Sequence, residues 1–179
     1  MTGSGSDKPL SGPRGAFAPE PGSDRITRRI EELRAAGEAL DVVLRDAKRF
    51  VGKAALAGAH HLVLVADDDV EARNMMSLGL QDLGFQVEQA RNGADAVAKA
   101  RASLPHAIVM DYSMPTMDGG EAARQLASDE RTRRIPILLL SGYPEVIPRD
   151  VRLGCAAFLA KPCEPGELGA LLHLMIAAS

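Results

Sequence analysis

Short apolar runs alternate with helical patterns over the last two thirds of the chain. The runs LVLVA (62–66), AIVM (107–110) and ILLL (137–140) are continuous and of strand length, which is typical of strands covered on both faces. The run FQVEQ (85–89) is mixed, as expected of an edge strand, and AAFLA (156–160) is a fifth candidate. The pattern therefore predicts five strands, each separated from the next by a segment long enough for a helix.

The segments between and after these runs have helical spacing. Pro144 and Pro148 interrupt the segment between the fourth and fifth strands, which makes it the poorest helix. Strand-helix alternation predicts an α/β fold, and five strands in about 115 residues favour a flavodoxin-like parallel sheet of order 2-1-3-4-5 with helices on both faces. The other helices are predicted at about 70–83, 94–104, 120–129 and 165–177.

The first 60 residues differ from the rest of the chain in composition and in hydrophobic pattern. Residues 1–23 are rich in Gly, Ser and Pro, which predicts a disordered tail. Residues 24–58 predict a long amphipathic helix before a domain at 60–179, and its seam could support a homodimer, dock on a larger assembly or pack back on its own domain. Spacings of four and three alternate along the seam, at positions 26, 30, 33, 37, 40, 44, 47, 51 and 54.

The composition argues against several classes of protein but does not identify the function. The chain has 179 residues, a net charge of −3, 3% aromatic residues and no Trp, so direct binding of nucleic acid is not expected. The sequence contains neither a run long enough for a membrane span nor the apolar core of a signal peptide. Its two cysteines fit a reducing compartment. These features together predict a cytoplasmic protein.

Acidic, hydroxyl and basic residues follow four of the five predicted strands. The first strand leads into Asp67 and Asp68, the third into Asp111, the fourth into Ser141 and the fifth into Lys161. Because the carboxyl ends of parallel strands share one edge, these side chains are expected to converge. Two carboxylates about 4 Å apart repel by roughly 4 kcal/mol at an effective dielectric constant near 20, so without a cation such a cluster would be costly or partly protonated.

The combination of these residues points to chemistry that none of them indicates alone. A lone aspartate at a strand end is usually a solvated cap, Ser141 alone is most often a turn residue, and Asp69 is predicted as the N-cap of the helix that begins at Val70. Together, an oxygen-only ligand set favours Mg²⁺. A carboxylate beside Mg²⁺ and a lysine is equipped to attack phosphorus as a nucleophile.

The same stretches resemble the receiver domains of two-component response regulators. The resemblance rests on four stretches, LVLVADDDVEAR (62–73), AIVMDYSMPTMDGGE (107–121), IPILLLSGY (135–143) and GCAAFLAKP (154–162). The 20 positions from 141 to 161 are about two fewer than the family usually has, and the shortfall lies in the proline-containing segment. His106 and Cys163 also depart from the family pattern, and both are interpreted as structural residues.

The resemblance implies a phosphoacceptor signalling protein and not an enzyme with a separate substrate. It would take a phosphoryl group from a histidine kinase or a histidine phosphotransfer protein and switch a protein-interaction surface. The implied roles are a phosphoacceptor at Asp111, Mg²⁺ ligands at Asp67, Asp68, Asp111 and the backbone carbonyl of Ser113, a switch pair at Ser141 and Phe158, and an ion-pair partner at Lys161.

Three alternatives remain at this point. A phosphatase of the haloacid dehalogenase type needs a second aspartate two positions after the nucleophile, where this chain has Ser113. A flavodoxin-like electron carrier is disfavoured because no hydroxyl-rich phosphate loop follows the first strand. The third alternative is an oligomerisation or scaffold module in which the 24–57 helix carries a receiver head and output passes through protein contacts.

Overall fold

Five parallel strands form the centre of the protein in a computed structural model that describes residues 61–179. The sheet order β2-β1-β3-β4-β5 is the predicted one and leaves β2 at an edge. The predictions for 1–23 and 24–58 lie outside the described residues. The strands are β1 (Leu62–Ala66), β2 (Gln86–Ala90), β3 (Ala107–Asp111), β4 (Ile137–Ser141) and β5 (Ala157–Ala160).

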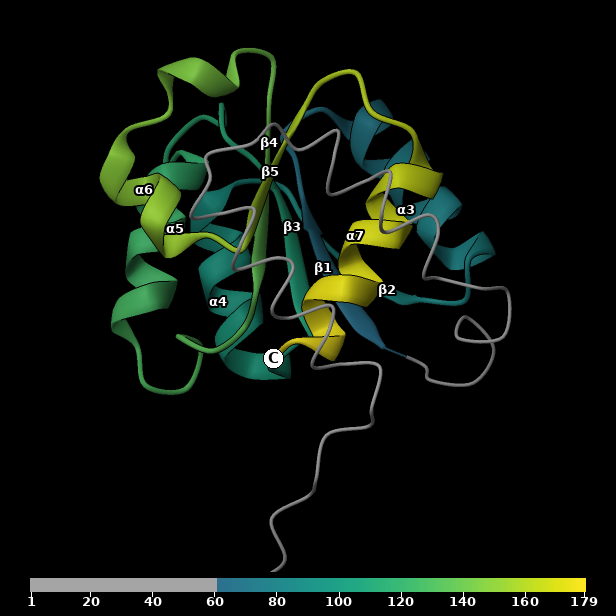
Figure 1. The fold of residues 1–179 in the computed structure, drawn as a ribbon, viewed down its shortest axis with the longest axis horizontal. Helices are drawn as coiled ribbons and strands as arrows, with labels where there is room; N and C mark the ends of the chain where they lie inside the picture. Colours follow the sequence, from purple (N-terminus) through teal and green to yellow (C-terminus); the bar gives the residue numbers. More distant parts are fainter. Residues whose placement is uncertain (1–60) are drawn as a thin grey trace, which may run out of the picture.

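Helices cover both faces of this sheet. The helices α3 and α7 lie on one face, whereas α4, α5 and α6 lie on the other (Figure 1). The predicted α/β architecture with helices on both sides is therefore confirmed. The helices are α3 (Val70–Asp82), α4 (Gly93–Ser103), α5 (Gly119–Ser128), α6 (Arg149–Gly154) and α7 (Pro165–Ala177), and a single 3-10 turn, η1, spans Pro144–Val146.

Local capping chemistry sets where the longer helices begin. The carboxylate of Asp69 accepts hydrogen bonds from the backbone N–H groups of Glu71 and Ala72, which confirms Asp69 as the N-cap of α3. Asn92 and Asp118 cap α4 and α5 in the same way. Pro165 occupies the start of α7, where its missing N–H costs no intrahelical hydrogen bond.

The connection between β4 and β5 contains the shortest α-helix among the described residues. The 3-10 turn η1 begins at Pro144, and α6 begins only after Pro148 and runs for 6 residues. A proline can occupy a helix start but cannot donate a backbone hydrogen bond inside one, so two prolines in this segment divide it. The predicted weakness of this helix is thus confirmed.

The strand register places the two layers of the core and the edge that carries the polar residues. Side chains on the face under α3 and α7 include Val63, Val109 and Leu138, all fully buried, whereas Leu64 and Ile108 lie under α4 and α5. Burial on both faces explains why these strands are continuous apolar runs. Asp111 pairs with Leu140 in the neighbouring strand, so β3 and β4 end together at one edge.

Among residues 61–179, no helix has both the length and the apolar character that a bilayer crossing requires.

We expect a valine in the central strand to contribute far more to stability than one on the surface. Val109 is 0% exposed and Val146 is 64% exposed. Val109→Ala should lower the free energy of unfolding by about 2–3 kcal/mol, because it removes two buried methyl groups and leaves a cavity. Val146→Ala, which has the same change in side chain, should stay within about 0.5 kcal/mol of wild type. Urea denaturation measures both values, and equal losses would contradict the assignment of this core.

Candidate functional site

Three carboxylates meet at the carboxyl-terminal edge of the sheet. Asp67 directly follows β1, Asp111 is the last residue of β3, and Asp68 lies beside Asp67. One oxygen of each carboxylate lies within 4.8 Å of the others. Asp67 and Asp111 are buried, with 1% and 6% of their surface exposed, whereas Asp68 is exposed. The three carboxylates expected to converge on this edge therefore do so.

Lys161 bridges the two buried carboxylates. Its Nζ lies 2.8 Å from Oδ2 of Asp67 and 2.8 Å from Oδ1 of Asp111. Burial alone would lower the pKa of Lys161, but the hydrogen bonds and charges of Asp111 and Asp67 outweigh burial and raise it. The lysine therefore stays protonated and offsets one of the three negative charges.

The carboxyl group of Asp111 is held in an environment that disfavours its charge. Burial raises the pKa of Asp111, and the nearby charges of Asp67 and Asp68 raise it further. The ammonium group of Lys161 acts in the opposite direction and does not cancel these effects. Asp111 is consequently a carboxylate whose negative charge is poorly compensated by the described residues alone.

Backbone and side-chain contacts hold Asp67 in place. The N–H of Asp69 donates to Oδ1 of Asp67 at 2.9 Å, and the N–H of Asp67 donates to the carbonyl of Ala90 at 3.2 Å. Arg73 donates from Nη1 to the backbone carbonyl of Asp67 at 2.6 Å. Sequence reasoning missed Arg73, although its place one helical turn after the N-cap Asp69 could have signalled a contact with the strand end.

Ser141 lies at the same edge of the sheet but does not touch the carboxylates through any described hydrogen bond. It is buried at the end of β4, one position beyond the residue that pairs with Asp111. Its Oγ accepts a hydrogen bond from the N–H of Tyr143 at 3.1 Å. The hydroxyl proton is not used in that contact.

Ser113 and Phe158 are the two remaining predicted site residues. Ser113 is an exposed residue in the loop after β3. Phe158 is in β5 opposite Leu139, two register positions before the pair formed by Ser141 and Ala160. Its ring is partly buried against the core, and the guanidinium carbon of Arg152 lies 5.5 Å from the ring centroid. Phe158 thus lies between the site edge and the surface formed by α6.

Gly119 closes the loop that follows Asp111. Its N–H donates to the carbonyl of Tyr112 at 2.9 Å. A Cβ at this position would collide with the backbone carbonyl oxygen of Asp111 and with the Cα of Tyr112. Because these neighbours are backbone atoms, a larger residue here would have to displace Asp111 itself.

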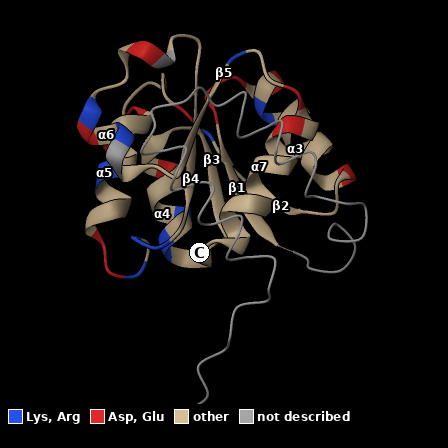
Figure 2. Ribbon diagram, viewed as in Figure 1, with Lys and Arg blue, Asp and Glu red and all other residues tan. Residues whose placement is uncertain are grey.

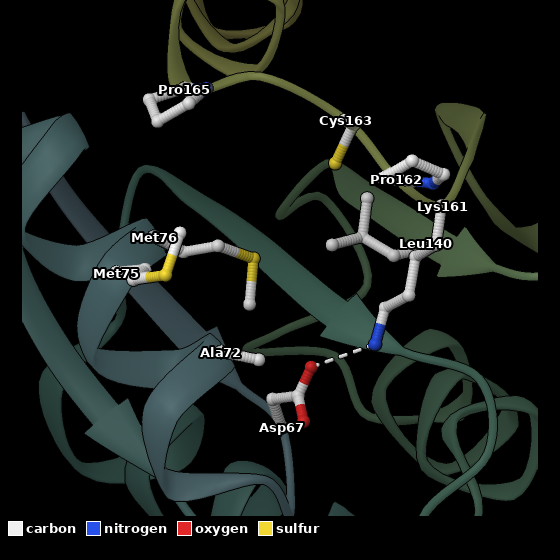
Figure 3. A pocket seen from close by; sticks show the side chains of 9 residues that line it. All are labelled: Asp67, Ala72, Met75, Met76, Leu140, Lys161, Pro162, Cys163 and Pro165. Atoms are coloured by element: carbon white, nitrogen blue, oxygen red, sulfur yellow. Dashed lines mark hydrogen bonds and ion pairs between the residues drawn. The ribbon is translucent and has the colours of Figure 1, made fainter.

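A cavity of about 390 Å³ opens beside the charged cluster (Figure 3). Asp67 and Lys161 line one part of it, and the remainder is apolar. No sequence motif predicts this cavity, because the residues that line it come from separate segments, among them α3, the end of β4 and the loop before α7. The other lining residues are Ala72, Met75, Met76, Leu140, Pro162, Cys163 and Pro165.

The donor set fits Mg²⁺. The cluster presents three carboxylates, and the oxygens of Asp67, Asp68 and Asp111 are close enough to share one ion. Hard oxygen ligands suit Mg²⁺, which binds to a few carboxylates and retains water molecules. With one lysine against three carboxylates, the local charge is two units negative. A divalent cation would neutralise that excess.

Comparison with known proteins gives consistent matches over the described domain. The family model described as the response regulator receiver domain matches residues 63–173. The protein PilH of Pseudomonas aeruginosa is 31% identical over 117 residues, which cover 64% of this chain and 97% of PilH. Several other curated relatives are longer: the chain spans only 51% of the response regulator Rre1 of Synechocystis.

Solved structures show the same likeness. The receiver domain of the sensor histidine kinase PA1611 of Pseudomonas aeruginosa, solved with a magnesium ion coordinated in its active-site cleft, is 30% identical with a TM-score of 0.62, covering 66% of this chain and 98% of that one. The chemotaxis response regulator CheY4 of Vibrio cholerae is 33% identical with a TM-score of 0.56, covering 62% of this chain and 93% of CheY4.

We expect Asp111→Asn to stabilise the fold at neutral pH. The raised pKa of Asp111 means that the folded chain binds the proton of this carboxyl more tightly than the unfolded chain does. Ionisation as the pH rises above the ordinary aspartate range therefore costs stability, and asparagine avoids that cost. Relief of part of the repulsion with Asp67 and Asp68 should raise the free energy of unfolding at pH 7 by about 1 kcal/mol or more.

Chemical denaturation at several pH values measures this effect. The gain should vanish below about pH 4, where Asp111 is protonated in both folded and unfolded chains, and should shrink in millimolar Mg²⁺. Asp82→Asn, at an exposed position at the end of α3, is the matched control and should change stability by no more than about 0.5 kcal/mol. An Asp111→Asn variant less stable than wild type at pH 7 would contradict the electrostatic account.

Proposed function

The chain belongs to the response regulator receiver domain family, and we propose that Asp111 is the residue on which it accepts a phosphoryl group. As a member of this family, it is a phosphoacceptor signalling protein of a two-component system. The observation that carries the proposal for Asp111 is its position. It is a buried carboxylate that ends the central strand, within hydrogen-bonding distance of Lys161 and beside two further aspartates.

The proposed reaction is an in-line transfer from a phosphohistidine. A carboxylate oxygen of Asp111 attacks phosphorus while the P–N bond breaks, and the bonding electrons remain on the imidazole nitrogen of the donor, which takes up a proton from water. Lys161, already 2.8 Å from Oδ1 of Asp111, is placed to interact with a phosphoryl oxygen as a point charge. The product is an acyl phosphate on Asp111.

Magnesium is the proposed cofactor of this transfer. Asp67, Asp68, Asp111 and the backbone carbonyl of Ser113 would hold it. When bound, Mg²⁺ supplies positive charge that offsets the charge on the phosphoryl oxygens. The support for this assignment is the oxygen-only donor set with its uncompensated negative charge.

The proposed donor is a histidine kinase or a histidine phosphotransfer protein in the cytoplasm. The chain itself would catalyse only its own phosphorylation and dephosphorylation, and its output would be a change in a protein-interaction surface. Both statements rest on membership of the receiver family and on a site that offers its own carboxylate as the acceptor.

The proposed switch joins Ser141 to Phe158. The hydroxyl of Ser141 accepts from Tyr143 and keeps its proton available, so it can turn and donate to a phosphoryl oxygen on Asp111. Such a turn would empty space at the end of β4, toward which the partly buried ring of Phe158 could move. The ring carries no hydrogen-bonding group, and its contact with Arg152 lies at the surface of α6, so this movement would alter that surface.

The phosphoacceptor assignment predicts a covalent change that depends on one residue. Wild-type protein incubated with acetyl phosphate and Mg²⁺ should gain the mass of one phosphoryl group, because a small donor needs only the nucleophile and its surrounding charges. Asp111→Ala should show no gain, and chelation of Mg²⁺ should abolish the gain in wild type. Mass spectrometry of the intact chain measures it, with Asp82→Asn as the control that keeps the reaction. Failure of the wild type to gain mass, or an equal gain in Asp111→Ala, would refute the assignment.

The switch assignment predicts that Ser141 couples the site to Phe158. Addition of beryllofluoride, a phosphoryl mimic, should shift the NMR signals of the Phe158 ring in wild type. In Ser141→Ala the mimic should still shift signals next to Asp111, while the Phe158 shift should fall by about half or more, because no hydroxyl turns inward. Ser128→Ala, at an exposed position at the end of α5, should behave as wild type. An unchanged Phe158 response in Ser141→Ala would disprove the coupling.

A further inference from the structure

Beyond its first turn, α7 has no charged side chain. Glu167, in the first turn, is the only charged residue among the 13 residues of this helix. Figure 2 shows α7 in tan along most of its length. A helix that faces water normally carries charged or polar residues on that side. The outer positions form a stripe of half-buried or exposed residues, here called the α7 stripe: Gly166, Ala170, His173 and Ala177.

The α7 stripe has the spacing of a helix-packing seam. Its positions are separated by four, three and four residues, as in a heptad pattern. The apolar seam at 26–54 has the same alternation, and within it positions 40, 44, 47 and 51 repeat the four-three-four order. Two helices whose contact rows share this period can pack at a shallow angle over several turns.

We propose that the segment 26–54 folds as a helix on the α7 stripe of the same chain. The two surfaces differ in side-chain size. The stripe consists mainly of glycine and alanine, which let a second helix approach closely but bury little apolar area themselves. The seam supplies the larger groups, among them Leu40, Leu44 and Val51. Large side chains from one helix then fill the depressions left by small residues on the other.

The point where the chain enters the domain places this segment next to the stripe. The carbonyl of His61 accepts from the N–H of Gln86 at 2.9 Å, which fixes the entry beside β2. The ring centroid of His61 lies 6.4 Å from that of His173, a member of the stripe. The six residues 55–60 can span roughly 20 Å. The linker is therefore long enough for the end of the seam to contact the α7 stripe of the same chain.

Length indicates which part of the segment fits. The 13 residues of α7 extend over about 20 Å, whereas a helix over 26–54 would extend over about 43 Å. Only the second half of the seam, nearest the entry at His61, can lie along α7, and the first half would project beyond it. A second copy of α7 is a poorer occupant of the stripe, because it would bring glycine and alanine against glycine and alanine.

Hydrogen exchange of the full chain tests the proposal. Backbone amides of 40–54 should be protected in wild type at a monomeric mass in sedimentation. Ala170→Glu places a charge in the stripe and should speed exchange of these amides by about tenfold or more, because the carboxylate would be buried against the seam. Ala98→Glu, at an exposed position in α4, is the matched control and should leave the exchange unchanged.

A second variant tests the same contact from the other side, in case Ala170→Glu does not fold. Leu44→Glu changes the seam and not α7, and it should shift the methyl NMR signals of Ala170 and Ala177, whereas Ala35→Glu, off the seam, should not. Three results would overturn the proposal: unprotected 40–54 amides in wild type, protection that Ala170→Glu leaves intact in a folded protein, or a dimeric mass that is lost with residues 1–58. The last would show that the seam pairs two copies of the chain.

Discussion

The site depends on the paired contacts that the ammonium group of Lys161 makes with Asp67 and Asp111. Asp67 directly follows β1, and Asp111 is the last residue of the neighbouring strand β3. The apolar residues of both strands are buried on both faces, so neither carboxylate can become exposed to water without disrupting the sheet. Lys161, at the end of β5, reaches both at 2.8 Å. The register of β1, β3, β4 and β5 must therefore be exact, because a slip of one residue would turn the shifted side chain to the opposite face.

The charges at the site do not balance, because one lysine lies against three carboxylates. A buried carboxylate that is fully paired is a weak nucleophile and a poor cation ligand, because its lone pairs are already occupied. Here the raised pKa of Asp111 reports that its negative charge is only partly compensated. The same deficit that costs folding stability would attract a divalent cation and, with it, an anionic phosphoryl group. Stability and the proposed function would thus oppose each other at one carboxyl group.

Sequence reasoning predicted the sheet order and the polar edge because both follow from period and position. Continuous apolar runs such as AIVM (107–110) are typical of strands buried on both sides, and the carboxyl ends of such strands meet at one edge of a parallel sheet. The spacing of Arg73 from Asp69 could have signalled a contact with the strand end, but not the hydrogen bond to the Asp67 carbonyl itself, and no pattern indicated the cavity beside Met75. They depend on how α3 is rotated against the sheet and on where the loop after β5 passes. Such relations arise from packing between segments distant in sequence, which no local pattern records.

The short connection between β4 and β5 has a consequence for how far a change at the site can spread. Ser141 ends β4, Phe158 lies in β5, and the segment between them is divided by two prolines into η1 and the 6-residue α6. A short helix has few buried contacts to hold it, so its position responds to small changes in the residues beneath it. Val151 and Ile147 are the buried anchors of this segment, and Arg152 rests on the ring of Phe158. Movement of that ring would therefore act on the shortest α-helix among the described residues, where a small displacement can change the shape of the surface.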